Sequence, residues 1–89
     1  LLIGESANKE TINGIKGILK TNIIIENVNE ILTMHMGPDF ILANISVDFK
    51  DSCQAGEIET TIETIDKRIK KQYPQIKRIF IEAEKSKIQ

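Results

Sequence analysis

Apolar residues recur along this chain at two different spacings, which divide it into two helix-like and three strand-like stretches. Apolar positions three and four residues apart predict a short amphipathic helix from Asn8 to Lys20. The same spacing predicts a second, longer helix that ends at Tyr73-Pro74, because the residue before a proline is pushed out of helical geometry. The two apolar stripes consist of Ile12, Ile15, Ile18 and Leu19 in the first helix, and of Ile58, Ile62, Ile65 and Ile69 in the second.

Individual residues indicate how stable the first helix is and where the second helix begins. Gly14 and Gly17 each weaken the first helix by about 1 kcal/mol relative to alanine, so its stability must come mostly from packing. The stretch from Asp51 to Gln54 has the pattern of a capping box, an acidic or hydroxyl cap followed three residues later by glutamine. This pattern predicts that the second helix begins there.

Strand signals occupy the middle and the end of the chain. An alternation with a period of two predicts strands from Val28 to Met36, from Phe40 to Phe49 and from Ile79 to Glu84. Between the first two strands, Gly37-Pro38-Asp39 has the chemistry of a tight turn. The first two strands should therefore form a hairpin.

The resulting order, α-β-β-α-β, restricts the fold. A hairpin makes its strands antiparallel, whereas a strand–helix–strand connection leaves its two strands parallel. If all three strands adjoin, the strand from Phe40 to Phe49 is central and the sheet is mixed. With both helices on one face, this is an α+β, ferredoxin-like fold that lacks its first strand. The apolar face beneath the helices is expected to consist of Leu32, Met34, Ile41, Ile45, Val47, Ile79 and Ile81.

The other face of the sheet is expected to be bare of helices and to mix apolar groups with possible metal ligands. This face carries more apolar side chains than a sheet that faces water usually has, which indicates that it contacts a partner. We expect a symmetric homodimer whose interface includes this face or lies beside it. Its nitrogen and oxygen donors are expected on His35, Asn44, Asp48, Glu82 and Glu84, although a lone histidine and paired glutamates are more often plain surface residues. The residues expected on this face are Asn29, Ile31, Thr33, His35, Phe40, Leu42, Asn44, Ser46, Phe80, Glu82 and Glu84.

Composition and charge narrow the classes of partner and of function. The 89 residues, 40% of them hydrophobic and 28% charged, are those of one ordinary globular domain. A net charge of -1 argues against nucleic acid as a partner. The basic cluster between Lys67 and Arg78 is interpreted as a solvated helix end, or as a contact with anionic lipid headgroups if the domain lies beneath a membrane.

The sequence offers little for catalysis. Cys53 is the only cysteine, so no intrachain disulfide can form and a reducing cytosol is the natural compartment. No Ser/His/Asp or Cys/His set and no glycine-rich phosphate loop is present. We therefore expect a binding domain and not an enzyme.

The order of elements, together with three motifs, resembles a known family. Over nearly all of its length the chain resembles the cytoplasmic C-terminal domain of the cation diffusion facilitator (CDF) family, membrane antiporters that export zinc and related divalent metals. The first residues, Leu1 to Glu5, resemble the end of that family's last transmembrane helix. Residues 1–7 are therefore expected to be the end of that helix and a linker, and residues 8–89 a cytosolic regulatory and dimerisation domain. The three motifs are His35-Met36-Gly37-Pro38-Asp39, Tyr73-Pro74-Gln75-Ile76 and Ile79-Phe80-Ile81-Glu82-Ala83-Glu84.

The resemblance also implies a function and partners. It implies a cytoplasmic domain of a protein embedded in the cell (inner) membrane, whose partners are a second copy, the transmembrane domain of the same chain and a divalent metal ion. The expected function is homodimerisation of a zinc-type efflux transporter, together with metal-dependent regulation of transport. The alternatives are a constitutive, metal-independent dimerisation module and a soluble ferredoxin-like domain that senses a ligand.

The resemblance sharpens the candidate metal site. In zinc-binding relatives the ligands map onto Asn29, Asn44, Glu82 and Glu84, and among these only Glu84 keeps its ligand type here. The candidate ligands for zinc or another divalent cation are His35, Glu82, Glu84 and Asn44. Three alternatives stay open: one metal held weakly by His35 with Glu82 or Glu84, a harder ion such as Mn²⁺, or no metal.

Overall fold

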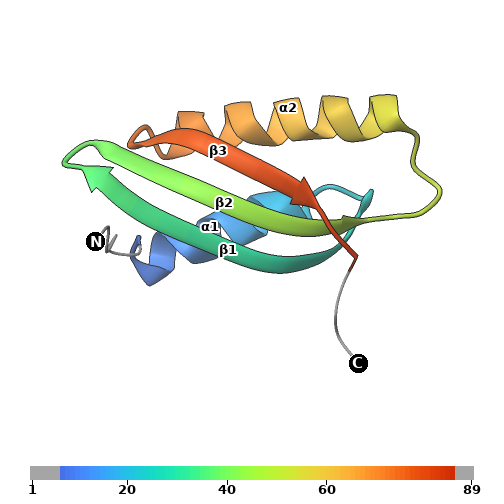
Figure 1. Cartoon of the computed structure of the whole chain (residues 1–89), viewed down its shortest axis with the longest axis horizontal. Coiled ribbons are helices and arrows are strands. Elements are labelled where there is room, and N and C mark those ends of the chain that lie inside the picture. The colour runs from blue at the N-terminus through green and yellow to red at the C-terminus, as the bar shows by residue number, and fades with distance from the viewer. Residues whose placement is uncertain (1–6, 86–89) are drawn as a thin grey trace.

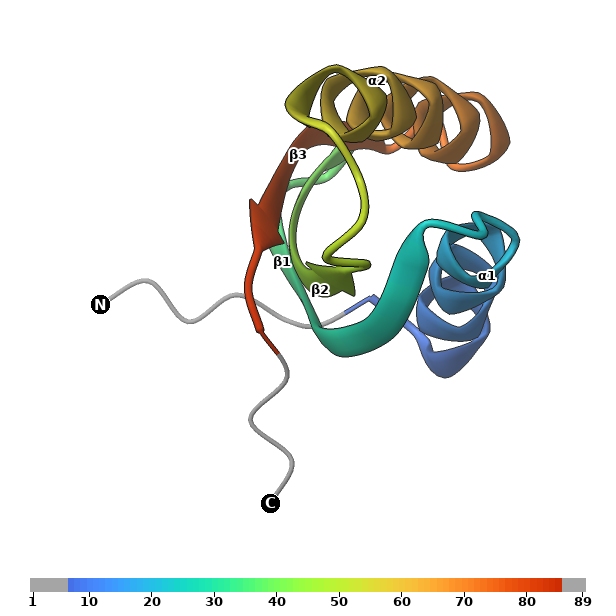
Figure 2. The same cartoon turned by 90° about the vertical axis from the view of Figure 1, so that its right-hand side faces the viewer.

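Two helices cover one face of a three-stranded sheet and leave the other face bare (Figure 1, Figure 2). The structure is a computed structural model that describes residues 7–85; the expected end of a transmembrane helix, in residues 1–6, lies outside this range. Within residues 7–85, no helix is long and apolar enough to cross a membrane. The elements in chain order are α1 (Lys9–Lys20), β1 (Ile25–Gly37), β2 (Phe40–Phe49), α2 (Ala55–Gln72) and β3 (Ile76–Ala83).

The sheet has the predicted topology. Its order is β1-β2-β3, with β1 antiparallel to β2 and β3 parallel to β2. Figure 2 shows both helices on the same side of the sheet. The prediction of an α-β-β-α-β, ferredoxin-like fold without its first strand is confirmed.

The core lies between the sheet and the two helices. β2 contributes every second side chain to it, from Ile41 to Phe49, as its unbroken alternation predicted. Both predicted helical stripes face this core except for Ile12, which is half-buried and does not belong to it; Ile58 and Ile62 pack against the core but are only half-buried at the start of α2. The fully buried large side chains are Ile15, Leu19, Ile45, Val47, Ile65, Ile69 and Ile76.

Each helix has an identifiable start. The Asn8 side chain accepts a hydrogen bond of 2.8 Å from the Thr11 amide and caps α1. The capping box of α2 lies three residues later than predicted. Gln54 is the N-cap, and its backbone N–H donates to the Glu57 carboxylate at 3.0 Å. Asp51 is therefore not the cap, because it lies in the turn that leaves β2.

One irregularity in β1 overturns part of the sequence prediction. Gly37 pairs with Phe40, but His35 pairs with Ile41, so Met36 is an extra residue with no partner on β2. Because successive side chains of a strand point to opposite faces, one extra residue moves every side chain further from the turn to the opposite face. Leu32 and Met34 were expected beneath the helices, and this prediction is wrong: they pair with Asn44 and Leu42 on the open face.

The same exchange moves three other residues of β1 to the helix side. Ile31, Thr33 and His35 were expected on the open face, but they pair with Ile45, Ala43 and Ile41 of the core-facing row. The Thr33 hydroxyl accepts a hydrogen bond of 2.7 Å from the Ala7 amide, just before α1, which places it on the helix side. The expectation for these residues is therefore wrong.

Candidate functional site

The open face of the sheet is ordered in three rows that run across the strands, and we take it as the candidate functional site. Neighbouring residues in a row have Cβ atoms about 5 Å apart in the antiparallel pair, so their side chains form one surface. Figure 1 views the sheet with α1 behind it. We name the rows the hairpin-end row (Met34, Leu42, Arg78), the middle row (Leu32, Asn44, Phe80) and the acidic row (Glu30, Ser46, Glu82).

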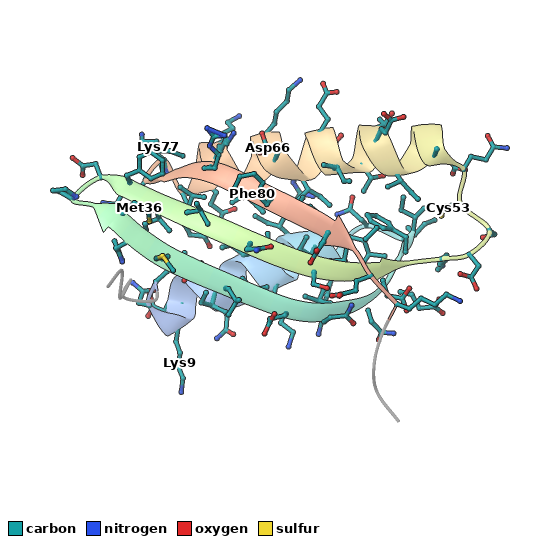
Figure 3. All side chains as sticks on the ribbon, in the orientation of Figure 1. Lys9, Met36, Cys53, Asp66, Lys77 and Phe80 are labelled. Atoms are coloured by element: carbon teal, nitrogen blue, oxygen red, sulfur yellow. The ribbon has the colours of Figure 1, made fainter. Side chains whose placement is uncertain are left out.

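Apolar side chains are exposed over the half of this face nearest the hairpin turn. Leu32 is 54% exposed, Phe80 50% and Phe40 40%. Figure 3 shows Phe80 midway along β3 and Met36 near the turn. The guanidinium carbon of Arg78 lies 5.8 Å from the centre of the Phe80 ring, a cation–π distance. Adjoining apolar side chains of this size on a small domain indicate a contact with another surface.

The other half of the open face is polar and holds a hydrogen-bonded cluster. The Ser46 hydroxyl donates to the Glu84 carboxylate at 2.6 Å. The side-chain amide of Asn29 donates to the backbone carbonyl of Glu84 at 2.9 Å and to the Ser46 hydroxyl at 3.3 Å. Ser46 is only 5% exposed. Its hydrogen bond to the Glu84 carboxylate belongs to the charge-assisted class, which is stronger than a bond between neutral groups. The cluster joins the three strands where β3 ends.

A second bulge in β1 brings Asn29 into this cluster. Val28 pairs with Val47 and Glu30 with Ser46, so Asn29 has no partner on β2. Its side chain reaches Ser46 and thus lies on the open face, as predicted. Ser46 itself was placed on this face by the sequence, but its role as the centre of a hydrogen-bonded cluster was not foreseen.

The structure places three of the four candidate metal ligands on one face of the sheet and the fourth on the other face. Glu82 follows Phe80 by two residues on the open face of β3, Glu84 reaches Ser46, and Asn44 lies in the middle row. His35 pairs with Ile41 on the opposite face, where its side chain is exposed at the hairpin end. The expectation that His35 shares a surface with the glutamates is wrong for a single protomer.

These donors do not fit a closed zinc site within one protomer. Tetrahedral zinc sites draw chiefly on Cys and His, and the open face described by residues 7–85 carries neither. In the same range no group of three or more His, Cys, Asp and Glu side chains gathers to hold a metal. Asn44, Glu82 and Glu84 offer oxygen, which suits a hard ion such as Mn²⁺ if further ligands come from a second chain.

The part of the basic cluster that belongs to α2 lies away from the open face, whereas Arg78 lies on the open face in the hairpin-end row. Lys67 pairs with Glu63 at 3.0 Å and Lys70 with Asp66 at 3.1 Å, each one helical turn apart. Lys70 and Lys71 lie in the last turn, where cations complement the helix dipole. This arrangement agrees with a solvated helix end.

The fold and its open face define a class of protein domain, in which an α-β-β-α-β chain forms a sheet with helices on one face and the other face exposed. Solved structures of the MamM C-terminal domain, a cytoplasmic domain of the CDF family, share this architecture. A nickel form of a variant of that domain is 14% identical, covers 86% of this chain and 96% of its own, and superposes with a TM-score of 0.75. The resemblance to the CDF cytoplasmic domain is thereby confirmed at the level of the fold.

Other forms of MamM give the same result. A cadmium form and a copper form, each of a variant, are both 13% identical, cover 85% of this chain and 94% of theirs, and have TM-scores of 0.74. No family model matches the sequence. No curated protein matches it either.

Proposed function

We propose that this chain is the cytosolic domain of a divalent metal cation efflux transporter and that it holds two protomers together through its open face. The observation that carries the proposal is the combination of the MamM-like fold, matched over 96% of that domain, with an open face that exposes Leu32, Phe80 and Phe40. On this proposal the domain binds and performs no catalysis. Its partners are a second copy and the transmembrane domain of the same protein, and the transported ion is cargo.

The physical basis for dimerisation is the small size of the domain. A chain of this length buries only about 60 to 65% of the surface that its unfolded form exposes, so burial against a second copy adds stability in proportion to the apolar area covered. The apolar half of the open face supplies that area. The core-facing side chains of β2 are already covered by the helices and cannot contribute.

A second candidate function, metal-dependent regulation, is favoured by the position of Asn44, Glu82 and Glu84 on one face. We propose that a divalent cation binds between two open faces and draws ligands from both protomers, because one protomer offers too few. The MamM domain has nickel, cadmium and copper forms, which is a precedent for ions on this fold. A cation that binds only the dimer stabilises it by about 2.7 kcal/mol at 100 times its dissociation constant.

Calorimetric titration with Zn²⁺ and with Mn²⁺, combined with sedimentation velocity of the same samples, tests both candidates. The chain alone is expected to form a dimer at micromolar concentration, and a bound cation is expected to tighten it. A dimer with no heat of cation binding would leave a constitutive dimerisation domain. A monomer at high micromolar concentration, with and without metal, would refute the proposed function.

The two faces of the sheet supply a matched control for the metal site. The double variant Glu82→Gln with Glu84→Gln keeps the size of both side chains, removes their charge and is expected to abolish the cation response. His35→Ala, on the other face, is expected to leave it unchanged. A response lost in His35→Ala and kept in the double variant would move the metal site to the other face of the sheet.

A further inference from the structure

Exposed lysines gather at the end of the domain that carries the hairpin turn, which we name the hairpin end. At this end β1 finishes, β2 and β3 begin, and α2 finishes. The first turn of α1 lies there too, because the Ala7 amide bonds to Thr33, near the end of β1. Within residues 7–85, three exposed lysines at this end form no ion pair with another residue. We name these three, Lys9, Lys71 and Lys77, the end lysines.

The opposite end of the domain, the far end, is acidic. β2 and β3 finish there, and β1 and α2 begin there. Its bases, Lys20, Lys50 and Lys85, are outnumbered by carboxylates. The net charge of -1 therefore conceals a separation of charge along the strands, which follow the longest axis of the molecule (Figure 1). The carboxylates of the far end belong to Glu26, Asp48, Asp51, Glu57, Glu82 and Glu84.

A solvated helix end explains only part of the basic end. Lys70 and Lys71 complement the dipole in the last turn of α2, and Lys70 also pairs with Asp66. Lys9, in contrast, is the first residue of α1, where the helix dipole disfavours a cation. Lys77 belongs to β3 and to no helix. Two of the three end lysines therefore do not stabilise a helix terminus, and what all three share is their position at the hairpin end.

An exposed apolar side chain lies at the same end. Met36 has no partner on β2 and is 45% exposed. Figure 3 shows Lys77 and Lys9 on opposite sides of Met36, with Cys53 at the other end of the molecule. Lysines spread around an apolar residue suit an extended anionic surface better than one small anion, which needs donors that converge. The boundary of a lipid bilayer is such a surface, because it offers phosphates to cations and an apolar layer beneath them.

We propose that the hairpin end docks on the anionic headgroups of the membrane, with the end lysines against the lipid phosphates and Met36 in the headgroup layer. The inference rests on the proposed function, under which the chain reaches the domain from the membrane at Ala7, and adds a lipid contact to its partners. Because Ala7 lies at the hairpin end, the basic end is the one nearest the membrane. An anionic surface attracts this end and repels the far end, and so orients the domain.

Two carboxylates at the hairpin end oppose the contact. Glu10 lies in the first turn of α1, and Asp39 lies in the hairpin turn itself. One basic residue near an anionic membrane raises binding about fivefold, and a carboxylate in the same place lowers it by a similar factor. The attraction is therefore modest for one domain and stronger for a dimer that presents two basic ends to one membrane. Arg78 is left out of the contact because it lies on the open face, which the second protomer covers.

Binding to vesicles tests the docking. We expect the chain to bind mixed phosphatidylglycerol and phosphatidylcholine vesicles at least about tenfold more tightly than pure phosphatidylcholine vesicles, and to lose this difference at high salt. Lys9→Gln, Lys71→Gln and Lys77→Gln should each weaken the binding about fivefold. Lys50→Gln removes the same charge just beyond the far end of β2 and should leave the binding unchanged. Co-sedimentation with vesicles at several lipid concentrations gives the binding constants.

The opposing carboxylate supplies a test of opposite sign. Asp39→Asn removes a repulsive charge from the hairpin turn and is expected to tighten the binding about fivefold. Asp51→Asn makes the same change beyond the other end of β2 and is expected to have no effect. Thermal melts confirm that the variants are folded.

Tryptophan fluorescence shows which end meets the lipid. The chain contains no tryptophan, so a single introduced one reports only on its own position. Met36→Trp is expected to shift its emission to the blue when anionic vesicles are added. Ile23→Trp, at a side chain that is 78% exposed at the far end, is expected to show no shift.

The outcomes separate the docking from the proposed function. Binding that weakens equally in Lys50→Gln and Lys77→Gln would reflect net charge alone and overturn the docking. A blue shift of Ile23→Trp without one of Met36→Trp would overturn it as well. A dimeric chain that does not distinguish the two kinds of vesicle would also overturn the docking, while the proposed function stood. A chain that stays monomeric would remove the proposed function and, with it, the basis of this inference.

Discussion

Two glycines in α1 show how differently neighbouring residues of one helix are constrained. A Cβ on Gly14 would overlap the hydroxyl of Tyr73, which follows α2, whereas a Cβ on Gly17 would meet nothing within 4 Å. Gly14 therefore permits the close contact between the middle of α1 and the residue that follows α2. Gly17 has no such role and only lowers the helix propensity.

The two glycines should respond to alanine in opposite directions. Gly17→Ala is expected to raise the free energy of unfolding by up to about 1 kcal/mol through helix propensity. Gly14→Ala is expected to lower it by about 1 kcal/mol, because the displaced tyrosine ring costs more than the propensity gains. Denaturant melts measure both; in a Tyr73→Val background the loss at Gly14 should vanish, and persistence of the loss there would contradict the contact.

Ser46 should be the most sensitive polar residue of the open face. Ser46→Ala removes the buried hydroxyl that donates to the Glu84 carboxylate at 2.6 Å and that accepts from the Asn29 side-chain amide at 3.3 Å. A loss of about 1 to 3 kcal/mol in the free energy of unfolding is expected. Glu84→Gln keeps an oxygen acceptor at the same place and should cost less in the same melts; equal costs would mean that the carboxylate charge and not the serine bond holds the strands.

Strand β1 differs from its sequence prediction because it carries extra residues. β2 alternates without interruption, and so the sequence alone places its core residues and Asn44 on the correct faces. Glu82 follows in the same way from the alternation of β3. β1, in contrast, changes face wherever a residue has no partner on β2.

The sequence reveals the bulge at Asn29 but not the bulge at Met36. Asn29-Glu30 places two polar residues in succession and interrupts the period of two, which is a signal for the bulge at Asn29. Met36 follows the alternation set by Met34, so nothing in the pattern reveals its bulge. For this reason the fold was predictable, whereas the position of His35 relative to the glutamates was not.

Removal of Met36 should be far more harmful than its truncation. Met36→Ala keeps the extra residue and, since the side chain is 45% exposed, is expected to cost less than about 1 kcal/mol. Deletion of Met36 should cost more than about 2 kcal/mol, because either the turn is distorted or Leu32 and Met34 are forced toward the helices. Thermal melts followed by circular dichroism compare the two; a tolerated deletion would show that the bulge does not set the register.

The domain as a unit has one face of its sheet covered by both helices (Figure 2). The other face is open and is divided into an apolar and a polar half. This division explains why a small domain with a sufficient core can still gain from a partner. It also separates the two parts of the proposed function, since dimerisation depends on the apolar half and the cation response on the polar half. The account as a whole depends on the open face being the dimer interface.

Sedimentation velocity of the chain and of two matched variants tests that dependence most directly. Phe80→Asp places a charge in the middle row of the open face, and Ile23→Asp makes the same kind of change at a side chain that is 78% exposed between α1 and β1. The account predicts a dimer for the unsubstituted chain and for Ile23→Asp, and a folded monomer for Phe80→Asp. A dimer that survives Phe80→Asp unchanged would contradict the account.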